Sequence, residues 1–191
     1  MASGSIRLQI IKSGTLTSNV TVPAGNLGDL QSGELILNRF NLASPLVLNT
    51  ASCQTPAVSV QMGDDYRLDE FNKTGDTPRL IKFNIGLNQC QNGIKKVTYS
   101  LKANTGSQAV DPQKGIVALN NGPKAAKGIG LQLMNDVGHP IALDTTYPFS
   151  GFDTAGTSFN IPLTAAYYRL ADGKLEAGIA NASVTFIVNY L

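Results

Sequence analysis

Few side chains in this chain of 191 residues are of the types that carry out catalysis or bind metals: it has one histidine, two cysteines and no tryptophan. His139 stands alone between Gly138 and Pro140, a turn sequence typical of a surface residue. Cys53 and Cys90 are too far apart for a CxxC motif, and no second histidine completes a mixed zinc site. Most metal and nucleophilic chemistries therefore lack the groups they need.

The two cysteines leave two interpretations, a pair of buried free thiols or one disulfide bond. The chain is rich in glycine, asparagine and threonine, which favours the disulfide and hence an oxidising compartment. In the chain-entropy model, closing a loop between Cys53 and Cys90 stabilises the fold by about 4 kcal/mol.

Other clusters match no catalytic or ligand-binding pattern. The acidic residues within positions 64–70 lack the spacing of a calcium-binding EF-hand loop. Gly128 and Gly130 lack the third glycine and the following helix that a dinucleotide site requires. A glycosidase needs two carboxylates about 5–10 Å apart in a cleft, and nothing selects such a pair among the 13 acidic residues. We therefore predict no catalytic residue, metal site or cofactor, and a protein that is not an enzyme.

Composition narrows the classes of partner. The 15 basic and 13 acidic residues give a net charge of +2, which supplies neither a basic surface for nucleic acid nor a polybasic run for an anionic membrane. Hydrophobic residues make up 42% of the chain, which excludes global disorder. The apolar runs are too short to span a membrane as a helix. A structural or binding protein fits these values best.

Short segments of alternating apolar and polar residues, separated by Gly, Pro, Asn and Thr, predict many β-strands. A helical turn is expected only at 65–72. This pattern predicts an all-β sandwich. The expected strands cover residues 6–10, 20–22, 35–40, 46–53, 58–60, 83–87, 97–101, 129–133, 159–167 and 184–190.

Two prolines refine this picture. Pro162 interrupts the longest alternating segment, and because proline cannot donate a ladder hydrogen bond, we expect that strand to lie at an edge or to be bulged there. Pro45, in the break at 43–45, marks the best candidate domain boundary. The chain is therefore divided into residues 1–45 and 46–191.

The last residues form an unusual strand, because chain termini tend to fray. Val184, Phe186, Val188 and Tyr190 alternate with Thr185, Ile187 and Asn189 in a segment that runs almost to Leu191. A strand of this kind needs partners on both sides or must lie at an edge. An apolar edge invites another strand to pair with it, which suits a polymer built by strand addition.

The same tail resembles the end of chaperone–usher pilus subunits. In that family a penultimate aromatic residue, here Tyr190, follows alternating apolar residues and a glycine fourteenth from the end, here Gly178. The resemblance covers about Leu46–Leu191, and it rests on the order of all its parts rather than on any one motif. Further segments that are similar to the family lie at 58–63, 71–76, 83–90, 130–133 and 161–167.

The resemblance implies an incomplete immunoglobulin-like β-sandwich, the pilin fold, which lacks its last strand and is preceded here by a short β segment. A periplasmic chaperone would fill the open groove first, and at the outer-membrane usher the donor strand of a neighbouring subunit would replace it. The finished fimbrium would stand on the surface of a Gram-negative bacterium. The residues implied to contact the chaperone or the donor strand are Gly178, Val184, Phe186, Val188, Tyr190 and Leu191, whose carboxylate basic chaperone residues would anchor.

The first 45 residues leave two interpretations open. They resemble the closing strands of the receptor-binding domain of a two-domain tip adhesin, whose receptor would be a host glycan, although most of that domain is missing. Alternatively, residues 6–10 are the donor segment of an ordinary shaft or adaptor subunit. The length of this 45-residue segment favours the adhesin interpretation. Two other classes remain as alternatives: a secreted carbohydrate-binding β-sandwich, and a complete immunoglobulin-like domain that is stable as a monomer.

Overall fold

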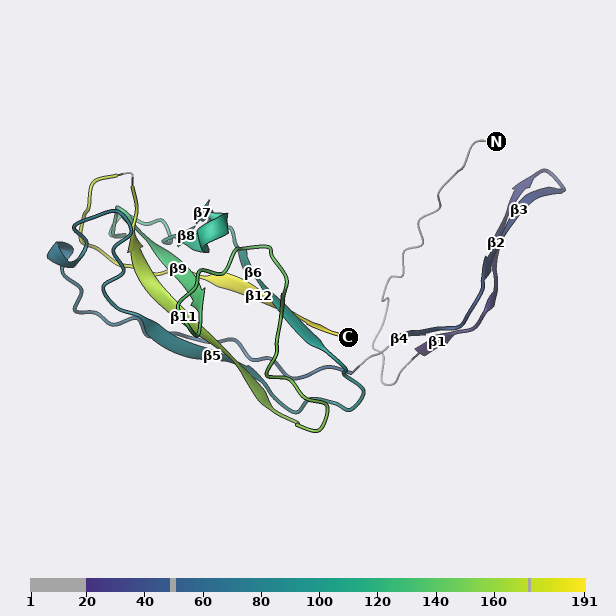
Figure 1. Cartoon of the computed structure of the whole chain (residues 1–191). Coiled ribbons are helices and arrows are strands. Elements are labelled where there is room, and N and C mark those ends of the chain that lie inside the picture. The colour runs from purple at the N-terminus through teal and green to yellow at the C-terminus, as the bar shows by residue number, and fades with distance from the viewer. Residues whose placement is uncertain (1–19, 49–50, 172) are drawn as a thin grey trace. The chain divides into compact units, whose positions relative to one another are not determined.

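The computed structural model describes residues 20–48, 51–171 and 173–191 (Figure 1). The strand expected at 6–10 lies outside the described residues. The chain divides into two compact units, Met1–Ala51 and Ser52–Leu191. Each unit is described by itself.

The described part of the first unit is one long antiparallel hairpin, residues 20–48, called here the N-terminal hairpin. Its strands β1 and β2 run to a turn at Gly33, and β3 and β4 return. None of its described side chains is buried, and Leu35 is 65% exposed. The hairpin therefore has no core of its own. Its strands are β1 (Val20–Val22), β2 (Gly25–Ser32), β3 (Leu35–Leu42) and β4 (Leu46–Leu48).

The strand expected at 46–53 is wrong in its last part. β4 ends at Leu48 and pairs with β1, whereas Ala51, Ser52 and Cys53 form no strand. The alternating pattern crossed the boundary between the two units, because it does not show which partner each half of a segment takes. β2 was not expected at all, since its glycines and polar residues hide the strand signal.

The second unit is an all-β sandwich of two antiparallel sheets, as predicted (Figure 1). One sheet has the order β5-β11-β9-β8-β7 and the other the order β10-β6-β12. Two short 3₁₀ turns, Leu68–Glu70 and Pro112–Lys114, complete it, the first within the helical turn expected at 65–72. The strands are β5 (Ile81–Leu87), β6 (Val97–Ala103), β7 (Ala109–Asp111), β8 (Ile116–Ala118), β9 (Ile129–Asn135), β10 (Tyr147–Pro148), β11 (Phe159–Arg169) and β12 (Val184–Tyr190).

The core lies between the sheets and is built from the alternating residues of the central strands. Ile161 and Leu163 of β11 are 1% exposed, and Val97 of β6 is fully buried. Burial of such a side chain contributes roughly 1.5–3 kcal/mol. The alternation of apolar and polar residues in these segments therefore indicates which face of each strand packs against the core.

Pro162 does not lie in an edge strand, because β11 has a neighbour on each side, β5 and β9. It is nevertheless at a place where a missing N–H is tolerated. Pro162 pairs with Asn84 of β5, whereas the ladder with β9 begins only at Leu163. The first part of β11 thus has one partner, as an edge strand does.

Residues 58–60 do not form the expected strand. The segment from Ser52 to Gly63 holds one isolated bridge, between Gln54 and Asn88, and no described ladder beyond it. A disulfide bond joins Cys53 to Cys90 and fixes the start of this segment to the chain after β5. The disulfide interpretation is therefore the one that the structure supports.

Candidate functional site

The C-terminal strand β12 is an edge strand. Its ladder with β6 runs from Val184 opposite Ala103 to Tyr190 opposite Val97. On its other side, no described strand pairs with it. Its inward side chains are only half-buried, unlike those of β6 and β11. One edge of β12 therefore has no described strand paired with it, and its inward face is only half-buried.

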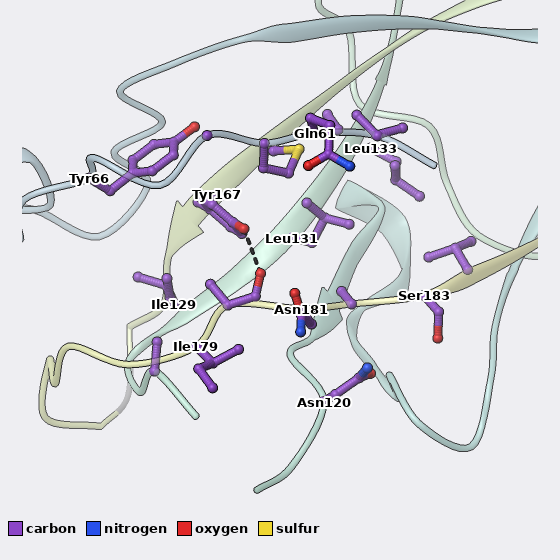
Figure 2. A pocket seen from close by; sticks show the side chains of 18 of the residues that line it. Gln61, Tyr66, Asn120, Ile129, Leu131, Leu133, Tyr167, Ile179, Asn181 and Ser183 are labelled. Atoms are coloured by element: carbon purple, nitrogen blue, oxygen red, sulfur yellow. Dashed lines mark hydrogen bonds between the residues drawn. The ribbon is translucent and has the colours of Figure 1, made fainter. Parts of the chain in front are cut away.

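A groove of about 1250 Å³ lies beside this edge (Figure 2). Two segments border it. Residues 57–63 are called here the first rim, and residues 177–183, which lead into β12, the second rim. Its floor is apolar and is formed by core side chains of the sandwich that are themselves buried, which include Leu101, Leu131, Leu133, Leu163, Ala165 and Tyr167.

The first rim has the sequence of a strand without the bonds of one. Val58, Val60 and Met62 alternate along it and line the groove, and Val58 is 37% exposed. Among the described residues, no backbone hydrogen bond involves this rim. The first rim and the free edge of β12 therefore border the same groove, and no described strand pairs with either of them across it.

Gly178 allows the second rim to pass close to the segment before β9. The Ile179 N–H donates to Lys124 O at 2.7 Å, and the Ala126 N–H donates to Ile179 O at 3.0 Å. A Cβ on Gly178 would lie 2.5 Å from Lys124 O and 2.6 Å from Ala126 N. The glycine is therefore required by space, and its contacts are with backbone that cannot easily move.

The side chains of Tyr167 and Ser107 hold the second rim in place. The Tyr167 hydroxyl donates to Ala180 O at 2.5 Å, and Figure 2 shows this bond as a dashed line. Burial raises the pKa of the Tyr167 hydroxyl further above its ordinary value. The Ser183 N–H donates to Ser107 Oγ, and that hydroxyl donates to Asn120 Oδ1. The rim is thus fixed although it is not part of a sheet.

Tyr66 and Arg79 form a cluster at one end of the groove that the sequence did not single out. The Arg79 guanidinium lies 4.3 Å from the centre of the Tyr66 ring, which packs edge-on against Tyr167 at 4.9 Å. Arg79 also donates to Asp65, holding the pKa of that carboxyl below its usual range, and to Glu70 at 3.1 Å. Asp65 and Glu70 are therefore tied through Arg79 to Tyr66, which lines the groove.

The other end of β12 is tied to the start of the unit. The Tyr190 hydroxyl lies 2.8 Å from Thr55 Oγ1 and 3.5 Å from Cys53 O. The Leu191 N–H donates to Lys96 O at 2.9 Å, and Leu191 O accepts from the N–H groups of Lys95 and Lys96. These bonds extend the ladder with β6 to the last residue.

The residues implied by the resemblance to contact a partner divide into two groups. Gly178, Val184 and Phe186 line the groove. Val188 and Tyr190 of β12, and Leu191 directly after it, do not line the groove, and their role in binding a partner stays a prediction. In the parts of the chain that the structure describes, no three His, Cys, Asp or Glu side chains are grouped so as to hold a metal ion. No helix within those parts is long and apolar enough to cross a membrane.

Sequence comparison finds relatives of one kind. The model of the family described as Fimbrial protein matches residues 41–191. The type-1 fimbrial protein C chain of Escherichia coli is 31% identical over 178 residues, which are 92% of this chain and 92% of that protein. The fimbrial subunit type 1 of Salmonella typhimurium is 26% identical over 151 residues, or 75% of this chain and 78% of that protein.

Solved structures of similar fold agree with these relatives. The CupB6 tip adhesin from Pseudomonas aeruginosa matches 81% of this chain with a TM-score of 0.58 and 25% identity. This chain spans 46% of that adhesin, less than half of its length. The P pilus rod subunit PapA matches 74% of this chain and 100% of its own, with a TM-score of 0.54 and 17% identity, which shows a shared fold.

Proposed function

Because the chain belongs to the fimbrial protein family of chaperone–usher pilus subunits, we propose that its groove accepts a β-strand donated by a neighbouring subunit. The observation that carries this proposal is the free edge of β12 beside the groove. A donated strand would pair with β12 on one side and with the first rim on the other. It would thereby complete the sandwich and join two subunits without covalent chemistry.

The dimensions and chemistry of the groove suit such a strand. β12 has seven residues, which extend over about 23 Å at roughly 3.3 Å per residue. Main-chain hydrogen bonds to both edges would supply affinity that depends little on sequence. Alternate side chains of the donor would enter the groove and cover Val58, Val184 and Phe186, which are exposed or half-buried, and this burial supplies the selective part of the binding.

An uncovered groove of this kind is an aggregation hazard, so the subunit would need protection before assembly. A periplasmic chaperone would hold the groove until the outer-membrane usher brings the next subunit. The same edge of β12 would serve both partners in turn. This order of events also implies that the protein crosses the periplasm on its way to the cell surface.

We further propose that the N-terminal hairpin is the remnant of a receptor-binding domain, which would make the chain part of a tip adhesin that mediates cell adhesion. A two-stranded hairpin is marginally stable in water, and this one exposes large apolar side chains that a larger domain would cover. The likeness to the CupB6 tip adhesin supports this interpretation. The large apolar side chains that the N-terminal hairpin exposes are Leu27, Leu30, Leu35, Ile36, Leu37 and Val47.

A second interpretation, an ordinary shaft or adaptor subunit, is favoured by a different observation. The type-1 fimbrial protein C chain matches 92% of this chain and 92% of its own length. On this interpretation, residues 6–10 would be the strand donated to a neighbour. The gene sequence that precedes the codon for Ile6 distinguishes the two, because only an adhesin has most of a receptor domain there.

The acceptor groove is tested by adding a synthetic peptide to the full chain. The peptide alternates leucine and threonine over about 11 residues with lysines at both ends, and is called here the alternating peptide. At 100 times its dissociation constant, binding stabilises the folded state by about 2.7 kcal/mol, which raises the melting temperature by roughly 10 °C. A scrambled peptide of the same composition is the control. Equal melting temperatures with and without the alternating peptide would contradict the proposal.

A further inference from the structure

A second pocket of the sandwich unit lies where β9 ends, and it shares no lining residue with the groove. Its volume is about 320 Å³, within the range of roughly 300–1,000 Å³ that small-molecule sites have. It is lined by Tyr99 of β6, by Asn135 and Asp136 at the end of β9, and by residues 148–151 and 159–162. Both sheets of the sandwich therefore contribute to this second pocket.

The start of β11 offers main-chain groups to the second pocket. Asn160 and Ile161 pair with β5, whereas the ladder with β9 begins only at Leu163. Successive residues of an antiparallel strand direct their N–H and C=O groups to opposite sides. Either Asn160 or Ile161 therefore directs a donor and an acceptor away from β5, and among the described residues no hydrogen bond on that side uses them.

A buried tyrosine forms part of the wall of the second pocket. Tyr99 is 8% exposed, and its ring lies 5.9 Å from that of Tyr147. Within the described parts of the chain, its hydroxyl takes part in no hydrogen bond. Burial raises the pKa of this hydroxyl, and Tyr147 and Asp136 nearby raise it further. Because a buried polar group without a partner is unfavourable, a ligand hydroxyl that reached Tyr99 would be stabilised there.

The residues at the end of β9 add a donor and an acceptor. Asn135 Oδ1 accepts from the N–H groups of Val137 and His139 at 3.2 and 2.8 Å. These bonds hold the side chain and, as far as the structure describes the chain, leave its amide NH₂ group unused. Asp136 is exposed, and of the described residues that line the pocket it alone is charged. The second pocket thus offers several neutral donors and acceptors and one carboxylate.

Phe149 and Phe159 supply the apolar part of the second pocket. Both rings are half-buried, their centres are 6.5 Å apart and their planes are inclined by 76°. Rings of this kind are rigid and cover much apolar surface of a ligand. A cation would leave most of the neutral polar groups unused, and a purely apolar ligand would leave Tyr99 and Asp136 without partners. The lining therefore suits a ligand that carries C–H groups on its face and several hydroxyls on its rim.

From this arrangement we infer that the second pocket binds one pyranose ring of a carbohydrate. The C–H groups of the sugar would lie on the phenylalanine rings, and its hydroxyls would bond to Tyr99, Asn135 and Asp136. A hydroxyl both donates and accepts, so neighbouring hydroxyls can serve the amide, the carboxylate and the main chain of residues 159–162 together. The small volume suits a single ring. The site is independent of the strand-acceptor groove and would make this unit a binding module as well as a structural one.

Ligand-detected NMR titration tests the inference with the full chain and four methyl pyranosides, those of glucose, galactose, mannose and N-acetylglucosamine. At least one of them is expected to bind. Tyr99→Phe removes only a hydroxyl and should weaken binding of that glycoside about fivefold, because one neutral hydrogen bond is lost. Asp136→Asn should weaken it about tenfold, since hydrogen bonds to a charged group are stronger. Circular dichroism checks that both variants keep the fold.

The matched control variants are Tyr168→Phe and Asp144→Asn, at positions outside the lining of the second pocket. They should leave the affinity for the glycoside unchanged. Saturation with the alternating peptide should also leave it unchanged, because the two sites share no lining residue. The inference is overturned if none of the four glycosides binds, if the pocket variants weaken binding no more than the controls do, if the alternating peptide displaces the glycoside, or if tetramethylammonium binds in place of the glycosides.

Discussion

The double variant Cys53→Ala, Cys90→Ala is expected to lose about 4 kcal/mol of its free energy of unfolding. The disulfide joins residues 37 positions apart, so its removal frees a long loop in the unfolded chain and raises the entropy of that state. It also releases the segment that leads into the first rim from the chain after β5. Urea unfolding of the second unit, followed by circular dichroism, measures the difference.

Reduction of the wild-type protein by dithiothreitol is the matched comparison, since it breaks the same bond without changing a side chain. Both samples should unfold at the same lower urea concentration. A wild-type protein whose midpoint is unchanged by full reduction, with two free thiols counted by mass spectrometry, would show that the bridge contributes nothing.

The variant Gly178→Ala is expected to destabilise the second unit by about 3 kcal/mol, the upper part of the usual range for forced overpacking. The added Cβ would meet Lys124 O at 2.5 Å and Ala126 N at 2.6 Å. Relief requires the second rim to move away, which breaks its bonds to this segment. The change should therefore also weaken binding of the alternating peptide, measured by titration calorimetry.

Gly122→Ala is the matched control for this substitution. Gly122 lies just before the segment 124–126 that Gly178 contacts, but nothing comes within 4 Å of a Cβ added to Gly122. Its stability and its peptide affinity should equal those of the wild-type chain. If both glycine variants behave alike, the close approach at Gly178 has no energetic importance.

The alternating pattern predicted the long central strands because each of them turns one face to a well-defined core. It predicted β11 and β12 almost to the residue, since Ile161, Leu163 and Phe186 repeat every second position. Short strands such as β7 and β8 are held by their neighbours rather than by their own pattern. They could not be found from three residues of sequence.

The segment at 58–60 shows the opposite case. Its alternation is that of a strand, yet it has no ladder in the isolated chain. If a donated strand completes the sandwich, the pattern encodes a partner that comes from another subunit. The sequence then describes the assembled state rather than the single chain.

Several features of the site depend on contacts between distant residues and were beyond sequence reasoning. The resemblance drew attention to Gly178, but the reason for the glycine, backbone of residues 124–126 a few ångströms away, appears only in the fold. The stacking of Arg79 on Tyr66 and the bond from Tyr190 to Thr55 likewise join segments that no local pattern connects.

Hydrogen–deuterium exchange of the full chain, with and without the alternating peptide, tests the completion of the sandwich most directly. Amides that face a free edge exchange quickly, and ladder hydrogen bonds slow them. We expect the peptide to protect β12 and the first rim together, while β6 and β11 change little. Protection of both edges before any peptide is added, or exchange at β12 that the bound peptide leaves unchanged, would contradict strand acceptance at this groove.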